Sequence, residues 1–325
     1  MSLSLSRHLP KDRESFSTLA VLVAFVGLFL VFATQADAFL TLGNLRNVLV
    51  NNVVLLAIVA LGVTFVVSSG GIDLSVGVSV DMASLVFVSA LAAGVAAPLG
   101  LAAGLGAALL VGLLNAILIA RLKISPFLAT LGVLFIGQSV QRLATGGGQP
   151  IYLVTKEYAA IFNAISRSSL LGVPTPVWVL ILCVLATWLA LHRMGFGRQV
   201  QAIGARPGVA WYSGIRVPSR LTQVYILAAV LAGITGILLS ATVRSYVPMS
   251  GNAFLLDAIG ATFIGTTISR ERRPSILGTL LGVALLAMVK NGLLLIGWNF
   301  YWQQVGIGVL VFAVLALSFG LQRRH

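Results

Sequence analysis

The stretch from Gly70 to Gly77 reads Gly-Gly-Ile-Asp-Leu-Ser-Val-Gly and carries one carboxylate, Asp73, between two long apolar runs. These runs, 53–67 and 78–97, each read as a membrane-spanning helix. Backbone outside a helix is tolerated at membrane depth only where protein buries it or a wet cavity reaches it. A carboxylate there is costly unless it is paired, and it marks a functional site by default. We therefore expect Asp73 to shape a path through the protein, to cap the helix that follows it, or to do both.

Other polar and aromatic residues inside apolar segments are candidates to line the same path. A lining that combines aromatic rings with amides suits a sugar, although rings at helical positions more often serve packing. Asp81 and Lys290 are further charges within apolar segments, and the sequence leaves their roles open. The candidate path residues are Asp73, Asn115, Phe127, Phe254, Asp257, Asn291, Trp302 and Gln303.

The sequence contains no pattern typical of a catalytic or metal site. It has no Gly-x-x-x-x-Gly-Lys-[Ser/Thr] phosphate loop, no His-Glu-x-x-His and no Gly-x-Ser-x-Gly. Cys183 is the only cysteine, and the three histidines (His8, His192 and His325) are far apart in sequence. We therefore expect no catalytic residue, no metal and no cofactor on this chain, and any ATP must be bound by another chain.

The composition identifies the setting of these residues as a membrane. Hydrophobic residues make up 58% of the chain and charged residues 9%, whereas a soluble domain has about 25% charged residues. The net charge of +13 could suggest nucleic acid, but the basic residues fall in short segments between apolar runs. The predicted fold is an all-α integral membrane protein, and the bilayer rather than nucleic acid is its partner.

Hydropathy predicts about ten transmembrane helices with both termini in the cytoplasm. In this layout fifteen basic residues fall in cytoplasmic segments and five in outer segments, as the positive-inside rule requires. Ala36-Asp37-Ala38 imitates a signal-peptide cleavage site, but a retained first span is the preferred interpretation because nine more spans follow. The expected spans are 18–38, 49–69, 77–96, 99–120, 125–143, 175–192, 221–241, 255–269, 275–297 and 301–319.

An internal repeat appears without gaps at an offset of 176 residues. The offset relates the fourth and fifth spans to the ninth and tenth, and five spans per half place the halves in opposite orientations. Inverted repeats are typical of transporters, and chance similarity of apolar helices is the alternative. The predicted organisation is a cytoplasmic tail (1–17) and one transmembrane domain (18–320) with halves at about 18–145 and 175–320. The matching segments are Leu105–Leu110 with Leu281–Leu286, Asn115–Ile119 with Asn291–Leu295, and Gly132–Leu134 with Gly308–Leu310.

The longest predicted cytoplasmic loop, 193–220, is rich in glycine and aromatic residues. Its segment Val209-Ala210-Trp211-Tyr212 would give a short helix an exposed apolar patch, which indicates a docking surface for another protein. The more specific hypothesis is that this partner hydrolyses ATP. The alternative is that the loop only connects two helices and binds no other protein.

Several of these segments together resemble the membrane permeases of bacterial ABC importers for monosaccharides such as ribose, arabinose, xylose and galactofuranose. Gly70–Gly77 is similar to their signature, and Gly204–Ile215 is similar to their coupling segment. Two departures are Arg206, where the family usually has asparagine, and the basic segment Thr266–Pro274, where it is glycine-rich. Further matches are Pro126-Phe127, Thr130–Gly132, Leu256–Ile259, Leu277–Thr279 and Asn291–Leu293.

The resemblance implies a ten-span permease of the bacterial inner membrane that carries a monosaccharide. It also implies a dimer with itself or a sister permease, two cytoplasmic ATPase subunits that bind ATP and magnesium, and a periplasmic substrate-binding protein. The alternatives are an ion-coupled secondary transporter and an ABC permease for another small solute, such as branched-chain amino acids. The residues expected to couple to the ATPase are Arg198, Gly204, Arg206, Ala210, Trp211, Tyr212, Ser213 and Gly214.

Overall fold

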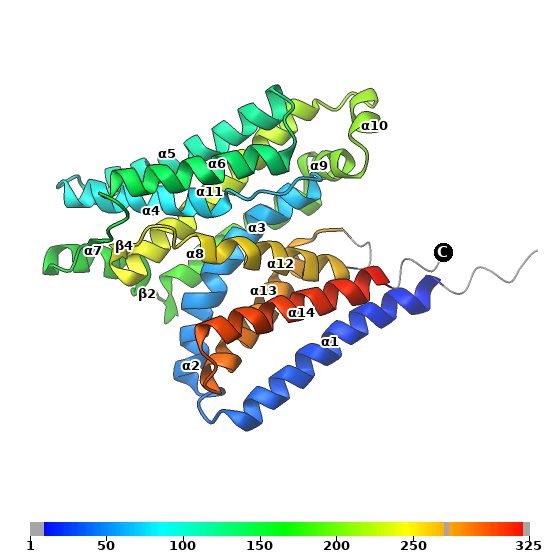
Figure 1. Ribbon diagram of the computed structural model, residues 1–325, viewed down its shortest axis with the longest axis horizontal. Helices are drawn as coiled ribbons and strands as arrows, with labels where there is room; N and C mark the ends of the chain where they lie inside the picture. The colour runs from blue at the N-terminus through cyan, green and yellow to red at the C-terminus, as the bar shows by residue number, and fades with distance from the viewer. Residues whose placement is uncertain (1–9, 270–272, 321–325) are drawn as a thin grey trace, which may run out of the picture. The chain divides into compact units, whose positions relative to one another are not determined.

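The computed structural model describes residues 10–269 and 273–320, and these residues are mostly helical (Figure 1). A helix lies at each of the ten predicted spans, with ends a few residues from those expected in most cases; α1 begins at Pro10, before the predicted start at 18. Predictions for the basic residues Arg7, Arg270, Arg272, Arg323 and Arg324 fall outside the described residues. The helices at these spans are α1 (Pro10–Gln35), α2 (Leu42–Asn47) with η1 (Val48–Val53) and α3 (Val54–Ser68), α4 (Val76–Ala92), α5 (Ala97–Ala116) with η2 (Ile117–Arg121), α6 (Pro126–Ala144), α8 (Thr175–Trp188) with η3 (Leu189–Arg193), α11 (Val217–Val243), α12 (Asn252–Ile268), α13 (Ile276–Leu295) and α14 (Phe300–Gly320), where η marks a π-helical segment.

Shorter elements join these helices. They are β1 (Ile151–Tyr152), α7 (Lys156–Ser166), β2 (Ser169–Leu170), β3 (Val173–Pro174), α9 (Gly195–Ala205), α10 (Pro207–Tyr212) and β4 (Ser245–Tyr246). Proline stands at the first or second position of α5, α6, α8, α10 and α11, where its missing N–H costs no helical hydrogen bond.

Six helices are long and apolar enough to cross a membrane, and three shorter apolar helices accompany them in the described part of the chain. This supports a multi-pass membrane protein, while the count of ten spans stays a prediction. The six are Leu42–Ser68, Ala97–Arg121, Pro126–Ala144, Thr175–Arg193, Val217–Val243 and Ile276–Leu295.

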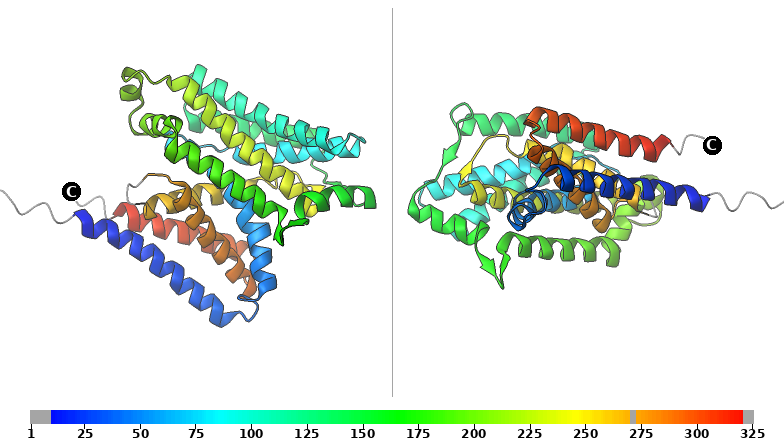
Figure 2. Two further views of the ribbon diagram at one scale, coloured as in Figure 1. Left: turned by 180° about the vertical axis from the view of Figure 1, so that it is seen from behind. Right: turned by 90° about the horizontal axis from the view of Figure 1, so that it is seen from below.

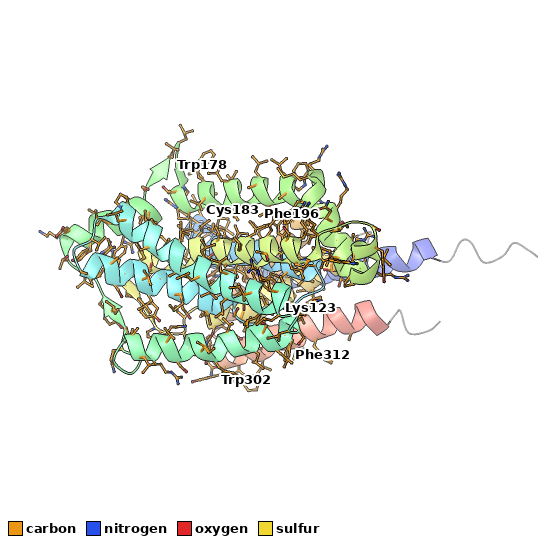
Figure 3. The ribbon with its side chains drawn as sticks, turned by 90° about the horizontal axis from the view of Figure 1, so that it is seen from above. Lys123, Trp178, Cys183, Phe196, Trp302 and Phe312 are labelled. Atoms are coloured by element: carbon orange, nitrogen blue, oxygen red, sulfur yellow. The ribbon has the colours of Figure 1, made fainter. Side chains whose placement is uncertain are left out.

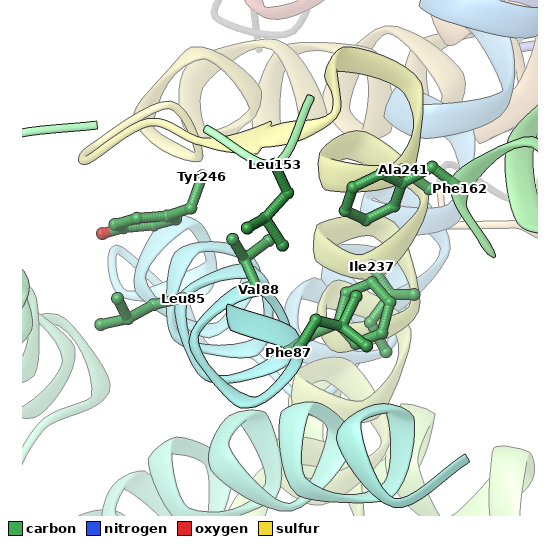
Figure 4. Packing of buried hydrophobic residues seen from close by; sticks show 9 residues of the cluster. Leu85, Phe87, Val88, Leu153, Phe162, Ile237, Ala241 and Tyr246 are labelled. Carbon is green, nitrogen blue, oxygen red and sulfur yellow. The ribbon is translucent and has the colours of Figure 1, made fainter. Parts of the chain in front are cut away.

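The larger of two compact units covers Val50–Ile259. Its centre is α11, which packs against α3, α4 and α5 (Figure 1). At one end of α4 and α11, the side chains of Phe87, Phe162 and Tyr246 belong to one buried apolar cluster (Figure 4). Phe87 and Phe162 meet edge to face, with ring centroids 6.1 Å apart, so α7 is fixed to α4. β1 and β4 pair beside this cluster with Ile151 opposite Tyr246.

The smaller unit contains the described residues up to Leu49 and those from Gly260 on. Its helices α1, α13 and α14 contact one another (Figure 2). Phe39 in the turn after α1 packs on the rings of Phe29 and Phe32. Asn44 of α2 and Asn291 of α13 exchange two amide hydrogen bonds of 2.9 Å.

The helix boundaries repeat at the offset seen in the sequence. Adding 176 to the bounds of α4 gives those of α12, Asn252 and Ile268. The continuous helix Leu42–Ser68 and α11 both have 27 residues, and their ends differ by 175 residues. α5 and α6 correspond in the same way, within a few residues, to α13 and α14. The breaks before α4 and α12 therefore occupy equivalent places in the repeat.

Candidate translocation path and docking surface

The break before α4 is built around Asp73. The chain leaves α3 at Ser69, passes Gly70 with φ +82° and re-enters a helix at Val76. The Asp73 side chain is buried, and its Oδ1 accepts hydrogen bonds from the Ser75 N–H at 2.8 Å and the Ser75 hydroxyl at 2.7 Å. Ser75 is itself the residue that precedes α4. Asp73 therefore closes a turn before the helix, and the expectation that it caps the first helical N–H groups is wrong.

Two neighbouring helices hold this break in place. The buried amide of Asn115 at the end of α5 donates to the Ser75 hydroxyl at 2.7 Å. The hydroxyl of Thr130 in α6 accepts from the Leu74 N–H at 3.0 Å and donates to the Pro126 carbonyl at 2.8 Å. The structure thus brings together Asp73 and Asn115, two of the predicted path residues.

Several buried polar atoms near the break have no hydrogen-bond partner among the described residues. They are the hydroxyls of Ser68 and Tyr225 and the Oδ1 of Asn115. Buried polar atoms are nearly always paired with protein or water. Three buried polar atoms without a partner in the described chain so close to Asp73 make the break unusually polar for the interior of a membrane protein.

A second polar group fixes the equivalent break before α12. Asp81 of α4 is fully buried, and its Oδ1 accepts from the Gly251 N–H at 2.7 Å and the Ser250 hydroxyl at 3.1 Å. Gln141 of α6 is also fully buried, and its Oε1 accepts from the Tyr246 hydroxyl at 3.0 Å and the Met249 N–H at 2.9 Å. We refer to Asp81, Gln141, Tyr246, Ser250 and Gly251 as the clasp.

The clasp holds a backbone segment that contains two strained residues. Arg244 and Met249 adopt left-handed conformations, with φ of 55° and 61°, which cost free energy in residues other than glycine. Burial raises the pKa of Tyr246, and the charge of Asp81 raises it further, so its hydroxyl stays protonated and donates.

The predicted docking surface lies on α9 and α10. Trp211 and Tyr212 are 60% and 91% exposed, and Val209 is exposed beside them. Ala210, in contrast, is buried and faces the protein. The expectation that it belongs to the exposed patch is therefore wrong, because four consecutive residues of a helix point in different directions and cannot all face the solvent. The other predicted coupling residues Arg198, Arg206, Ser213 and Gly214 are exposed, and Gly204 is half-buried.

The predicted docking surface contacts the segment around Asp73 directly through α9. Phe196 of α9 stacks on Phe65 of α3, with ring centroids 5.9 Å apart, and Figure 3 labels Phe196 among the side chains of this region. Gly204 lies against the backbone that leaves α3. A Cβ at Gly204 would lie 3.0 Å from the amide nitrogen of Gly70 and would overlap the carbonyl oxygen of Ser68.

Comparison with known proteins identifies the family to which this chain belongs. Residues 45–315 match the family described as branched-chain amino acid transport system / permease component. The chain belongs to this family of permeases. The predicted resemblance to importer permeases is confirmed.

Individual relatives cover nearly the whole chain. The ribose import permease protein of Bacillus subtilis (strain 168) is 33% identical over 297 residues, which are 90% of this chain and 91% of that protein. The ribose import permease protein of Escherichia coli (strain K12) is 33% identical over 300 residues, 92% and 91% of the two chains. An autoinducer 2 import system permease protein of Yersinia pestis (strain Pestoides F) is 33% identical over 270 residues, 82% and 81% of the two chains. No solved structure matches the permease.

The remaining predicted path residues of the permease have separate surroundings. In α12, Asp257 is buried and Phe254 half-buried, whereas Phe127 at the start of α6 is 51% exposed. In the smaller unit, Asn291 pairs with Asn44, Trp302 is exposed and meets Trp298 edge to face, and Gln303 donates to the Trp298 carbonyl at 2.8 Å. Lys290 is half-buried in α13.

Reasoning from sequence missed Gln141, Tyr246 and Ser250 of the clasp. One feature of the sequence could have identified Asp81, the acidic residue of the clasp. Asp81 and Asp257 are separated by 176 residues and are therefore equivalent positions of the repeat, six residues into α4 and α12.

Proposed function

We propose that this permease forms the membrane path of an ABC importer for a small sugar, driven by ATPase subunits that dock at α10. The contact of Gly204 with Ser68 and Gly70 carries this proposal, because it joins the exposed docking surface to the polar break without an intervening element. Motion of α9 on ATP binding would then move the Asp73 segment directly. ATP and magnesium would be held by the partner subunits.

The exposed aromatic pair of α10 is suited to that docking. Large aromatic side chains dominate the binding energy of interfaces when a partner buries them. Trp211 and Tyr212 would enter a groove of the ATPase subunit, and the exposed arginines Arg198 and Arg206 would contribute polar contacts around them.

Ten spans in two inverted halves are supported by the charges of equivalent loops. The connection after η2 contains Lys123 and follows Arg121, whereas its counterpart before α14 is uncharged and begins Gly297-Trp298-Asn299. Conversely, the uncharged connection 93–96 corresponds to 269–272, which reads Ser-Arg-Glu-Arg. Basic loops stay in the cytoplasm, so equivalent loops on opposite sides would differ in this way.

The nature of the cargo rests on the relatives and on the polar atoms near the break. Two of the relatives are named for ribose and one for autoinducer 2, and a sugar could bond to Asn115, Tyr225 and Asp73 through its hydroxyls. The family description names branched-chain amino acids, which makes these the competing cargo in a transport assay. We propose the bacterial inner membrane as the location, with a periplasmic binding protein that delivers the solute and a second permease copy or a sister permease that completes the path.

Reconstitution would test this function. The permease would be co-expressed with the ATPase and binding protein encoded beside it, purified by a tag on the permease and placed in vesicles. We expect ATP hydrolysis to rise when loaded binding protein is added, together with uptake of a labelled pentose. Uptake that persists without ATP and collapses with an uncoupler would overturn the proposal in favour of an ion-coupled transporter, and leucine uptake without pentose uptake would overturn the sugar assignment.

A further inference from the structure

A small β-hairpin stands immediately before α8. Its strands β2 and β3 pair with Ser169 opposite Pro174 and Leu170 opposite Val173, which leaves Leu171 and Gly172 as a two-residue turn. Both turn residues have positive φ, 54° for Leu171 and 78° for Gly172, as a type I′ turn requires. Asparagine or aspartate followed by glycine is the favoured pair for this turn, whereas leucine is disfavoured in the left-handed region.

The two leucines at the tip of the hairpin, Leu170 and Leu171, do not pack in the core of the protein. Leu171 is 85% exposed and Leu170 is 62% exposed. A bulky apolar residue that occupies a strained and exposed position gains nothing from packing within the described chain. Such outliers persist where they have a role, and a surface outside the described chain that covers the tip would give these leucines one.

The position of the hairpin identifies that surface. Thr175, the first residue of the candidate span Thr175–Arg193, donates its N–H to the Ser168 carbonyl at 2.9 Å. Trp178, in the first turn of α8, donates its indole N–H to the Leu170 carbonyl at 3.1 Å. The two views of Figure 2 show the hairpin leaving the end of α8 to the side, away from α4 and α5, and Figure 3 shows Trp178 beside it. The tip thus lies beside the bundle at the level where a membrane span begins.

We propose that Leu170 and Leu171 insert into the interfacial region of the lipid bilayer and anchor the end of α8 there. Residues 168–178 contain no charge, so the tip offers no ion pair to a protein partner, while apolar side chains partition readily into the interface. Tryptophan prefers this level of a membrane, and the exposed Arg167 just before the hairpin suits lipid phosphates. The inference needs α8 to span the bilayer but is independent of the transported solute and of the ATPase.

Depth-dependent quenching in vesicles would test the anchor. Leu171→Cys would be introduced into the full-length permease together with Cys183→Ala, which removes the only native cysteine, and labelled with a nitrobenzoxadiazole dye. The labelled protein would be placed in vesicles of phosphatidylethanolamine and phosphatidylglycerol. One series would contain a lipid with a nitroxide near the headgroup, and the other would receive aqueous iodide. Val154→Cys is the matched control, because Val154 is 75% exposed but is followed closely by Lys156 and Glu157.

We expect quenching by the nitroxide lipid to be at least about twofold stronger at position 171 than at position 154, and quenching by iodide to be weaker by a similar factor. Equal quenching of both positions by iodide would overturn the proposal. Shielding of position 171 only after binding protein is added would also overturn it, because the tip would then be a protein contact.

A second pair of variants separates insertion from folding of the hairpin. With the dye at Leu170→Cys, Leu171→Asn should lose nitroxide quenching although asparagine favours the turn, whereas Leu171→Met should keep it. Equal quenching in both variants would show that the apolar tip has no part in membrane contact.

Discussion

The carboxylate of Asp81 and the backbone N–H of Gly251 meet at 2.7 Å across a sequence separation of 170 residues. This bond joins α4 of the first repeat to the break before α12 in the second. The same carboxylate oxygen accepts from Ser250, so one side chain sets the starting point of α12. The first break, around Asp73, is closed by its own carboxylate instead.

Asp81→Ala should destabilise the permease more than Asp81→Asn. Alanine leaves the Gly251 N–H buried without an acceptor, which costs about 1–3 kcal/mol, whereas the asparagine amide still offers an oxygen. Thermal unfolding of the purified protein in detergent would measure the difference. Ser89→Ala, at the other end of α4 and half-buried, is the control and should change little. Equal losses for both Asp81 variants would mean that the charge, rather than the acceptor, stabilises the clasp.

Tyr246→Phe should cost about 0.5–1.5 kcal/mol, because it removes one neutral hydrogen bond to Gln141 and keeps the buried ring. The residue is completely buried in the cluster around Phe87 and Phe162, so Tyr246→Ala should cost several times more through the cavity it creates. Unfolding by heat in detergent would compare the two. If Tyr246→Phe were as damaging as Tyr246→Ala, the hydroxyl would have a larger role than one hydrogen bond.

Gly204→Ala should uncouple ATP hydrolysis from uptake in reconstituted vesicles. The added methyl group overlaps the carbonyl of Ser68 and approaches Gly70, so α9 must shift away from the break that it is proposed to move. Gly195→Ala is a matched control in the same helix, because its Cβ would meet only the Arg198 side chain, at 3.8 Å. We expect uptake per ATP to fall at least about tenfold for Gly204→Ala. Unchanged uptake per ATP would contradict the proposed linkage.

Trp211→Ala and Tyr212→Ala should each weaken co-purification of the ATPase subunit without unfolding the permease. Both side chains are exposed, so their loss leaves the core intact, while truncation of an aromatic anchor typically costs an interface about 2 kcal/mol or more. Tyr152→Ala, a change at another exposed aromatic residue in β1, serves as control. An ATPase that co-purifies equally with all three variants would place the docking surface elsewhere.

Much of this architecture could be predicted from local sequence. Apolar length predicts where the helices lie, and Gly70, Gly71 and Asp73 mark the break between α3 and α4. The clasp could not be predicted, because Ser250 and Asp81 are 169 residues apart and nothing local to Gln141 in α6 indicates its partners. The buried side of α10 was missed for a related reason. A helix of six residues has too few positions for hydrophobic periodicity to define which face is buried.

The equivalent residues Asn115 and Asn291 should differ in what they contribute. Asn115 supports the Asp73 break through Ser75, and its Oδ1 is among the unpaired buried atoms. Asn115→Ala should therefore reduce the rate of uptake strongly while changing the unfolding temperature little. Asn291 exchanges two bonds with Asn44, and Asn291→Ala should mainly lower the unfolding temperature. A double-mutant cycle of Asn291→Ala with Asn44→Ala would show a coupling of about 1–2 kcal/mol if this pair is structural. Measurements of uptake and of the unfolding temperature for both single variants distinguish a structural residue from a path residue. An Asn291→Ala protein of normal stability that no longer transports would assign Asn291 to the path instead.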